Sequence, residues 1–291
     1  MGYQVRFLPS RWSEVFALLG RRKSVVVLNW FEDRAALPGP AIWMLLKSLL
    51  LLAIVRLSFR RVVWVRHNLR PHNQYSALVY RSLLGLLPRL ADKTVTHRPV
   101  PGMTTECVPH PLYTCEPPAD EQERDIAYLC FGAIKPYKQI DQLLKRWPAS
   151  RPLVIAGVCV DAAHEAHIRS VIAERKLNVQ WSNRFLDYEE LCQLLGRTRF
   201  VVLAHLDRSM IVSGTFFHAI SLGANVLVRD GDFYRHYLKD FSSVTPFTLD
   251  SLESDLLNAT ALPAAQVRRE AEERLSGERC AEQWKAVLSG G

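Results

Sequence analysis

Short apolar runs alternate with longer segments of helical periodicity along most of the chain. In the first part, apolar or β-branched runs predict strands at residues 3–8, 24–30, 61–66, 93–96 and 107–110. Between them, apolar positions that recur every three or four residues predict helices at residues 12–19, 41–55 and 75–90. The unbroken Val-Val-Val-Leu run inside the second strand is typical of a strand buried on both faces of a parallel sheet.

A segment rich in proline and charge, residues 109–124, interrupts this alternation and is the predicted linker. After it, strands are predicted at residues 126–131, 152–157, 178–181, 200–204 and 225–228. The helices predicted between and after them cover residues 140–147, 161–175, 188–196, 214–222 and 233–239, and a final amphipathic helix covers 265–287.

This alternation predicts an α/β protein with two open parallel sheets. The predicted domains are residues 1–115 and 116–264, followed by a helical segment, 265–291, that packs back toward the first domain. In such sheets the ligand is expected at the carboxyl ends of the strands.

The predicted helix at residues 41–55 is the most hydrophobic segment of the chain. At about 1.5 Å per residue it would reach about 22 Å, which is short of the roughly 30 Å hydrocarbon core of a bilayer. Lys47 lies in its middle, so we do not expect it to span a membrane. Two interpretations stay open: a core helix of the sheet, or a helix lying in a membrane interface with Arg56, Arg60 and Arg61 toward the lipid headgroups.

Charge is distributed unevenly between the two halves. The composition, with 48% hydrophobic and 23% charged residues, is that of a globular protein. Residues 1–115 hold 16 Lys and Arg against 5 Asp and Glu, whereas the rest of the chain holds 21 against 24. The first half is therefore expected to meet something anionic, a membrane surface or a nucleic acid. No basic recognition helix or aromatic-basic motif supports nucleic acid, which we do not expect as a partner.

The six cysteines, at positions 107, 115, 130, 159, 192 and 280, show no paired spacing that would hold zinc. We interpret them as reduced, mostly buried thiols of a cytosolic protein. Residues 1–20 contain no apolar core long enough for a signal peptide, so the chain is expected to stay inside the cell.

Residues 131–138, Phe-Gly-Ala-Ile-Lys-Pro-Tyr-Lys, combine the features of a phosphate cradle. They follow an apolar strand and precede a predicted helix, whose N-terminus would present free N–H groups and a partial positive charge. Lys135 and Lys138 add full charges, and Gly132 permits the turn. A diphosphate would fit there, although a plain solvent-facing loop is the competing interpretation.

The order of motifs resembles that of GT-B glycosyltransferases, specifically the family-4-type enzymes of bacterial exopolysaccharide and capsule synthesis. The resembling segments are residues 29–32 (Asn-Trp-Phe-Glu), 63–72, 91–97, 108–113, 131–138, and 212–214 with 219–223. The resemblance implies the GT-B architecture, with two Rossmann-like parallel-sheet domains that face each other across a cleft. It also implies a nucleotide-sugar donor in the C-terminal domain and an acceptor in the N-terminal one.

The resemblance implies donor-binding roles for several residues. Lys138 occupies the family's lysine position at the donor diphosphate, after Gly132. A helix opened by Ser213, Gly214 and Thr215 would face the same diphosphate, and Arg184 lies in the loop that usually holds the nucleotide base.

The chain also departs from the family pattern. Met210 and His218 replace two carboxylates that many relatives carry, and Ala133 and Gln139 replace an arginine and a glycine of the first motif. Arg208 could restore the missing charge from the neighbouring loop.

The catalytic candidates lie in the first half. His67 follows a strand, and a resembling histidine lines the active site of relatives; His72 lies beyond a proline turn, and Glu32 follows the preceding strand. A structural histidine is the alternative for the first two, and a solvated turn for Glu32.

The sequence therefore predicts a glycosyltransferase that transfers a hexose from GDP-mannose or a UDP-hexose to a lipid-linked glycan. The acceptor is expected to be a polyprenyl-diphosphate-linked oligosaccharide of exopolysaccharide or capsule synthesis, at the inner face of the cell membrane. We expect no metal and no cofactor, because Lys138 and a helix N-terminus can stabilise the leaving diphosphate. The alternative is a binding subunit without catalytic activity.

Overall fold

The computed structural model describes Val15 and residues 24–69, 75–100, 102–115, 124–205 and 210–289. The predicted strand at residues 3–8 lies outside the described residues, as does the predicted helix at 12–19 except for Val15, which is helical and buried. The chain divides into two compact units, Met1–Val108 with Glu282–Gly291, and Pro109–Ala281.

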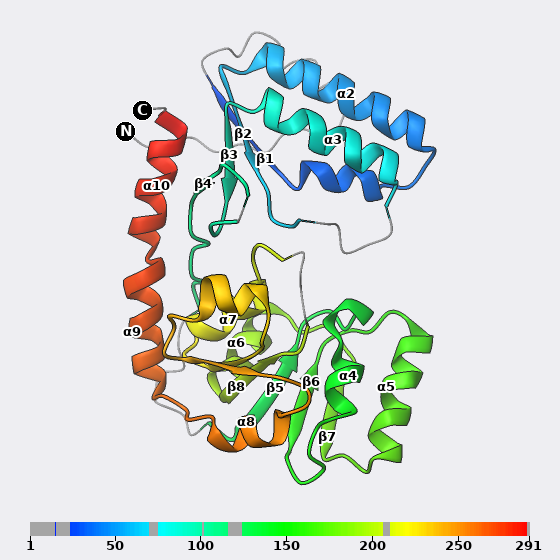
Figure 1. The fold of residues 1–291 in the computed structure, drawn as a ribbon, viewed down its shortest axis with the longest axis vertical. Helices are drawn as coiled ribbons and strands as arrows, with labels where there is room; N and C mark the ends of the chain where they lie inside the picture. The colour runs from blue at the N-terminus through cyan, green and yellow to red at the C-terminus, as the bar shows by residue number, and fades with distance from the viewer. Residues whose placement is uncertain are drawn as a thin grey trace. The chain divides into compact units, whose positions relative to one another are not determined.

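The first unit is built on a parallel sheet in the order β1-β2-β3-β4. Its strands are β1 (Val25–Asn29), β2 (Arg61–Val65), β3 (Lys93–Thr96) and β4 (Glu106–Cys107). The 3₁₀ helix η1 (Phe31–Ala36) and the helices α2 (Ala41–Ser58) and α3 (Ala77–Leu90) complete it, with α2 and α3 packed against each other (Figure 1). The strands predicted at 24–30, 61–66 and 93–96 and the helices predicted at 41–55 and 75–90 are confirmed, and α2 continues three residues beyond its predicted end. The strand predicted at 107–110 shares only Cys107 with the observed β4.

Successive side chains of β2 point to opposite faces of the sheet, and each face packs against a different helix. Val62 and Trp64 belong to the apolar cluster with Leu52 and Val55 of α2, whereas Val63 and Val65 belong to a cluster with Val287. Val287 lies in α10 (Gly277–Ser289), and the nearby Arg61 guanidinium donates a hydrogen bond to the carbonyl of Leu288 at 2.8 Å. The end of the chain is therefore part of the first unit.

Among the described residues, α2 is the one helix long and apolar enough to cross a membrane by length and composition. Its inner face, however, contributes Leu52, Ile54 and Val55 to the buried core of the first unit. It is thus a helix packed on the sheet, with an outer face that remains exposed.

The second unit is a six-stranded parallel sheet in the order β10-β9-β8-β5-β6-β7. The strands are β5 (Ile126–Phe131), β6 (Leu153–Ala156), β7 (Val179–Ser182), β8 (Thr198–Leu203), β9 (Asn225–Arg229) and β10 (Val244–Phe247). The helices are η2 (Pro136–Lys138), α4 (Ile140–Leu144), α5 (Ala162–Glu174), α6 (Tyr188–Gly196), α7 (Gly214–Ser221), η3 (Tyr234–Leu238), α8 (Leu252–Asn258) and α9 (Ala264–Leu275).

The predicted strands of this unit are confirmed, but the sequence patterns missed β10 and α8. Pro246 in the middle of β10 is tolerated because β10 lies at the edge of the sheet. The single final helix predicted at 265–287 is two helices, because the backbone is extended at Ser276, between α9 and α10. The predicted helix at 233–239 is a π-helix, η3.

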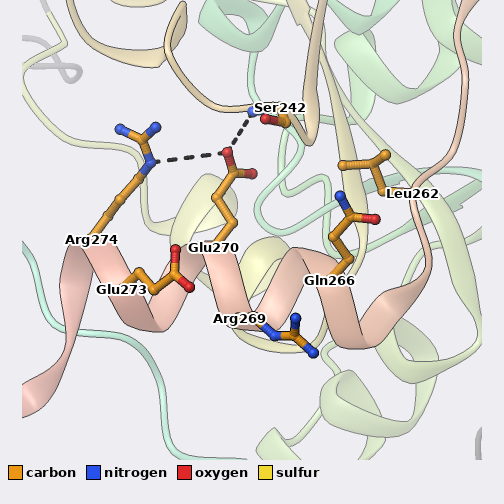
Figure 2. A pocket seen from close by; sticks show the side chains of 7 residues that line it. All are labelled: Ser242, Leu262, Gln266, Arg269, Glu270, Glu273 and Arg274. Carbon is orange, nitrogen blue, oxygen red and sulfur yellow. Dashed lines mark hydrogen bonds and ion pairs between the residues drawn. The ribbon is translucent and has the colours of Figure 1, made fainter.

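A hollow of about 370 Å³ opens beside α9 (Figure 2). It lies at the amino ends of the strands: Ser242 precedes β10, and Leu262 exchanges two 3.0 Å hydrogen bonds with Asn225, the first residue of β9. The Glu270 carboxylate within it accepts hydrogen bonds from the backbone N–H groups of Ser242 and Ser243 and faces Arg274. The Glu270 carboxylate therefore stabilises the turn before β10.

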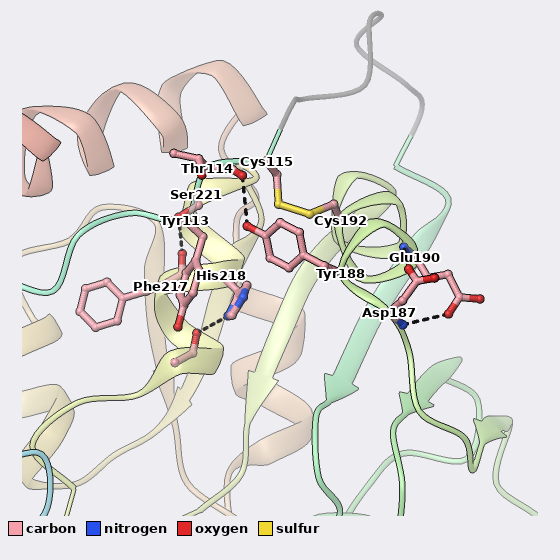
Figure 3. The surroundings of a disulfide bond; sticks show 11 residues. Tyr113, Thr114, Cys115, Asp187, Tyr188, Glu190, Cys192, Phe217, His218 and Ser221 are labelled. Carbon is pink, nitrogen blue, oxygen red and sulfur yellow. Dashed lines mark hydrogen bonds between the residues drawn. A yellow bond between two sulfur atoms is a disulfide. The ribbon is translucent and has the colours of Figure 1, made fainter. Parts of the chain in front are cut away.

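The boundary between the units falls at residue 108, seven residues before the predicted one. Residues 109–115 belong to the second unit because they are fastened to it. The N–H of Tyr113 donates to Ser221 Oγ of α7 at 2.9 Å, and the Tyr188 hydroxyl donates to the carbonyl of Thr114 at 3.2 Å (Figure 3).

A disulfide joins Cys115 to Cys192 of α6, with a Cα–Cα distance of 6.2 Å (Figure 3). The prediction that all six cysteines are reduced thiols is therefore wrong for this pair. The two residues are 77 positions apart, and only the folding of β5, β6, β7 and α6 brings them together, so their spacing carried no signal. The other cysteines are free, and Cys107 is exposed.

Candidate functional site

The strand order of the second unit reverses between β5 and β8. From β5 the chain proceeds outward through β6 and β7, and then returns to place β8 on the other side of β5. At such a point the two connections leave in opposite directions and open a crevice at the carboxyl ends of the strands. A small hollow lies there, lined by Phe131, Lys138, Ala204, His205 and Thr215 among other residues. This is the candidate donor site.

Lys138 contributes the cation of this site. Its Nζ donates a 3.0 Å hydrogen bond to the carbonyl of Phe131, the last residue of β5. Burial lowers the pKa of Lys138 to about 8, so the ammonium is still mostly charged at neutral pH. Burial raises the pKa of the adjacent Cys130 thiol to about 12, which keeps that group neutral.

Two glycines allow close backbone approaches beside Lys138. Gly132 has a φ of +89°, and a Cβ there would lie 3.0 Å from Lys138 Nζ. At the end of β6, Gly157 has a φ of +143°, and its Cβ would lie 2.1 Å from the carbonyl oxygen of Gly132. Both positions therefore require glycine. The predicted role of Gly132 in the turn fits this geometry, whereas the need for glycine at 157 was missed.

The N-terminus of α7 reaches the same hollow. Ser213 caps the helix by accepting a hydrogen bond from Phe216 N–H at 3.4 Å, and Gly214 and Thr215 form its first turn. Thr215 lines the hollow together with Lys138. The structure thus brings together the lysine and the helix terminus that the sequence analysis placed at a diphosphate, with free N–H groups and a full positive charge on one side.

The two predicted arginines differ in position. Arg208 lies outside the described residues. Arg184 pairs with Glu190 at 2.7 Å, and this hydrogen-bonded partner raises the pKa of Arg184. Glu190 also closes the capping box of α6 with Asp187, so Arg184 is tied to that helix start and does not line the hollow.

A different arginine comes close to the first motif. Arg229, the last residue of β9, donates a hydrogen bond to the side chain of Gln139. Gln139 itself has a left-handed backbone, with φ 54°, a conformation that glycine adopts more readily than other residues. Burial lowers the pKa of Arg229 from its usual high value. The sequence analysis missed this residue, although an arginine directly after an apolar strand could have been noticed.

Neutral groups occupy positions 210 and 218, where the family that the sequence resembles commonly carries carboxylates. Met210 is buried, and its sulfur lies 3.2 Å from His205 Nε2. His218 stacks on Tyr113 with ring centroids 3.4 Å apart, and its Nδ1 lies 2.9 Å from the carbonyl of Gly214 (Figure 3). Burial lowers the pKa of His218, which favours the neutral imidazole.

In the first unit, side chains gather at the carboxyl ends of β1, β2 and β3. His67 Nε2 lies 3.0 Å from Asn29 Oδ1, and its ring stacks on Trp30 with centroids 3.9 Å apart. His97 follows β3, and its ring centroid lies 4.9 Å from that of His67. Trp30 adopts a left-handed backbone and leaves 52% of its surface exposed. His67 itself is buried below this ring, and a catalytic role for it stays a prediction.

The other two catalytic candidates are less accessible. Glu32 is 2% exposed, and its carboxylate accepts a 2.9 Å hydrogen bond from the indole of Trp64. Burial raises its pKa. The hydrogen bond links η1 to β2, so the observed role of Glu32 is structural. His72 lies outside the described residues.

The two hollows differ in what they offer a ligand. The larger one beside α9 lies at the amino ends of the strands, and its two arginines, Arg269 and Arg274, are offset by Glu270 and Glu273. The small hollow at the carboxyl ends presents Lys138 and the start of α7. The smaller hollow is therefore the better phosphate site.

Comparisons with known proteins agree with this architecture. No protein-family model and no curated protein sequence matches the chain significantly. Among solved structures, AviGT4, a glycosyltransferase involved in avilamycin A biosynthesis, is similar, with a TM-score of 0.58 and 18% identity over 96% of this chain and 78% of that one.

Two further structures give the same result. Sucrose-phosphate synthase from Thermosynechococcus elongatus has a TM-score of 0.65 and 14% identity over 91% of this chain and 73% of that one. The pneumococcal O-GlcNAc transferase GtfA, in complex with UDP and GlcNAc, has a TM-score of 0.63 and 14% identity over 95% of this chain and 59% of that one. At these identities the similarity concerns the fold. With its two parallel-sheet units, the chain has the GT-B fold of these glycosyltransferases.

Proposed function

We propose that this protein is a glycosyltransferase that takes a sugar from a nucleotide-sugar bound in its second unit. The observation that supports this most directly is the meeting of Lys138 and the start of α7 at the hollow between β5 and β8. Similar solved structures include an O-GlcNAc transferase with UDP bound, which fits a donor carrying a diphosphate.

In the proposed reaction, an acceptor hydroxyl oxygen forms a bond to the anomeric carbon while the bond from that carbon to the diphosphate oxygen breaks. Negative charge then develops on the leaving diphosphate. The Lys138 ammonium and the N–H groups at the start of α7 stabilise this charge, which is why we propose a reaction that needs no metal. His67 is the proposed base for the acceptor hydroxyl, or, if the sugar configuration is retained, a contact to the substrate.

The donor and acceptor are proposals that rest on the sequence resemblance. We propose GDP-mannose or a UDP-hexose as donor and a polyprenyl-diphosphate-linked oligosaccharide of exopolysaccharide or capsule synthesis as acceptor. The protein would work at the inner face of the cell membrane. Similar structures include synthases of sucrose phosphate and trehalose phosphate, so small sugar phosphates are the acceptors to compare in an assay.

Thermal unfolding with GDP, UDP and ADP tests the donor site, because a ligand that binds only the folded state raises the melting temperature. We expect one of these nucleotides to raise it and Lys138→Ala to abolish the shift. Lys145→Ala, on the exposed end of α4, is the matched control and should keep the shift. An equal shift in Lys138→Ala and wild type would remove Lys138 from the diphosphate site.

The second candidate function is a nucleotide-sugar binding subunit without catalytic activity. It is favoured by the neutral groups at Met210 and His218, where many relatives carry carboxylates. This function predicts the same thermal shift but no release of nucleoside diphosphate when donor and a panel of lipid-linked and phosphorylated sugars are supplied. Measured turnover with any of these acceptors would exclude it.

A further inference from the structure

Exposed apolar side chains are concentrated in one part of the first unit. Fourteen large hydrophobic side chains are exposed among the described residues, and nine of them lie between Trp30 and Leu78. A soluble surface normally carries such residues singly, and a group of them marks a site of interaction.

Helix α2 carries the centre of this group. Trp43, Leu46, Leu50 and Leu57 are exposed by 60%, 49%, 47% and 63%, and their spacing of three, four and seven residues places them on one face of the helix. We call these four residues the outer face of α2. The opposite face is buried in the core through Leu52 and Val55, so the outer face points away from that core. With 18 residues, the helix is about 27 Å long.

The surroundings of this face are basic and lack acidic side chains. Between Asp33 and Asp92 the chain contains nine Lys and Arg and no Asp or Glu. Lys47 is exposed beside the outer face, and Arg56 and Arg60 are exposed at the end of the helix. Arg56 pairs with Asp92 at 3.8 Å, which leaves the charge of Lys47 and Arg60 to act on a partner.

We propose that the outer face of α2 docks the protein on an anionic lipid surface. The apolar side chains would enter the boundary between headgroups and acyl chains, and the surrounding cations would bind the lipid phosphates. Trp43 at the start of the helix suits the interface itself. The helix lies on the surface and does not cross it, because crossing would withdraw Leu52 and Val55 from the core of the unit.

Charge also decides against a second copy of the chain as the partner. Pairing two α2 helices would bring two basic surfaces together with no acidic side chain from residues 34–91 to offset them. An anionic lipid surface complements these charges. This inference does not rest on the proposed donor site, and nucleotide binding is expected to persist whether or not the protein binds lipid.

Sedimentation with lipid vesicles tests the proposal on the full chain. We expect binding to vesicles of phosphatidylcholine and phosphatidylglycerol in equal parts, weaker binding at high salt, and little binding to phosphatidylcholine alone. Leu46→Ser with Leu50→Ser should lower the partition coefficient by about tenfold or more. Lys47→Gln with Arg60→Gln should lower binding to the anionic vesicles only.

Matched controls come from the second unit. Leu257→Ser removes another exposed leucine, 65% exposed on α8, and Arg146→Gln removes an exposed arginine; both should bind vesicles as the wild type does. Wild-type tryptophan fluorescence should also be quenched by brominated lipid, and Trp43→Phe should lose most of this quenching. This second measurement does not depend on how well the leucine variant folds.

Three results would overturn the proposal. The first is an absence of binding by the wild type at low salt. The second is equal binding by the leucine variant and the Leu257→Ser control. The third is a wild-type dimer in analytical ultracentrifugation that the leucine variant converts to monomer while neither binds vesicles, which would make the outer face of α2 an interface between copies.

Discussion

At the scale of single residues, the candidate donor site depends on Lys138 and on the two glycines near it, Gly132 and Gly157. The ammonium lies against the backbone at the end of β5, where a Cβ at residue 132 would lie 3.0 Å from it. A Cβ at residue 157 would collide with the backbone of Gly132. A charge held by a backbone carbonyl beside a helix terminus is already positioned for a diphosphate. The two glycines therefore determine where the backbone beside Lys138 can lie.

Gly132→Ala should abolish nucleotide binding and lower the free energy of unfolding by about 1–3 kcal/mol, because alanine is strained at a φ of +89° and its Cβ would displace Lys138 Nζ. Calorimetric titration with the nucleotide and urea unfolding measure the two effects. Gly277→Ala is the control, since that glycine lies in α10 with nothing within 4 Å of the added Cβ. It should keep binding and gain a few tenths of a kcal/mol. Unchanged binding in Gly132→Ala would show that Lys138 does not need its present position.

The lowered pKa of Lys138 predicts a pH dependence of donor binding. The ammonium is protonated below its folded pKa of about 8 and neutral above it, so affinity for a nucleoside diphosphate should fall as pH rises through about 8. Because the unfolded lysine titrates near 10.5, the unfolded chain binds more protons than the folded one between these values. The contribution of Lys138 to stability without ligand therefore rises with pH across that window.

Lys138→Arg separates this effect from other titrations. A guanidinium stays charged throughout the range, so the variant should bind nucleotide with an affinity that no longer falls above pH 8. The measurement is the dissociation constant of the best nucleotide across the range in both proteins. The same decline in wild type and variant would assign the pH dependence to another group.

At the scale of elements, the sequence predicted what depends on local pattern and missed what depends on distant partners. The apolar runs of β5 and β8 and the glycine and lysine after β5 are local signals, so both the strands and Lys138 could be found from them. β10 was missed because Pro246 interrupts its pattern, and only its position at the edge of the sheet makes that proline acceptable.

The contacts near the site that the sequence analysis missed join residues far apart in the sequence. Arg229 meets Gln139 across 90 positions, and Tyr113 stacks on His218 across more than 100. Neither pair has a spacing that distinguishes it from chance, because the contact is created by the order of the strands. The sequence alone therefore points to Lys138, Gly132 and the start of α7, but not to contacts such as that between Arg229 and Gln139.

The disulfide between Cys115 and Cys192 belongs to this scale, because it fastens the segment before β5 to α6. It closes a loop of 77 positions, and its loss should lower the free energy of unfolding by about 2–4 kcal/mol through the greater freedom of the unfolded chain. Urea unfolding of Cys192→Ser measures this, with the free, exposed Cys107→Ser as the control that should not change.

Thiol titration of the unfolded, unreduced protein should give four thiols from the six cysteines. A result of six would mean that the pair is reduced in the purified protein. Because disulfides are rare in reducing compartments, the same titration on protein taken directly from cells also tests the proposed cytoplasmic location.

At the scale of the whole molecule, the chain enters the second unit at residue 109 and returns to the first for its last ten residues. These residues matter because β2 needs a cover on the face opposite α2, and Val287 supplies it by packing with Val63, Val65 and Val95. The sheet of the first unit is therefore completed by the far end of the sequence. Its stability should depend on residues that the chain adds only after the entire second unit.

Val287→Ala tests this dependence. Removing the two buried methyl groups should cost the first unit about 1–3 kcal/mol, because the side chain is 5% exposed and the neighbouring valines cannot fill the space. Lys285→Ala, exposed on the same helix, should cost little. Hydrogen exchange resolved by peptide should then show faster exchange in β1, β2 and β3 of Val287→Ala, and unchanged exchange and nucleotide binding in the second unit. Equal acceleration in both units would mean that they unfold as one cooperative body, and the last helix would then stabilise the donor site as well as the sheet it covers.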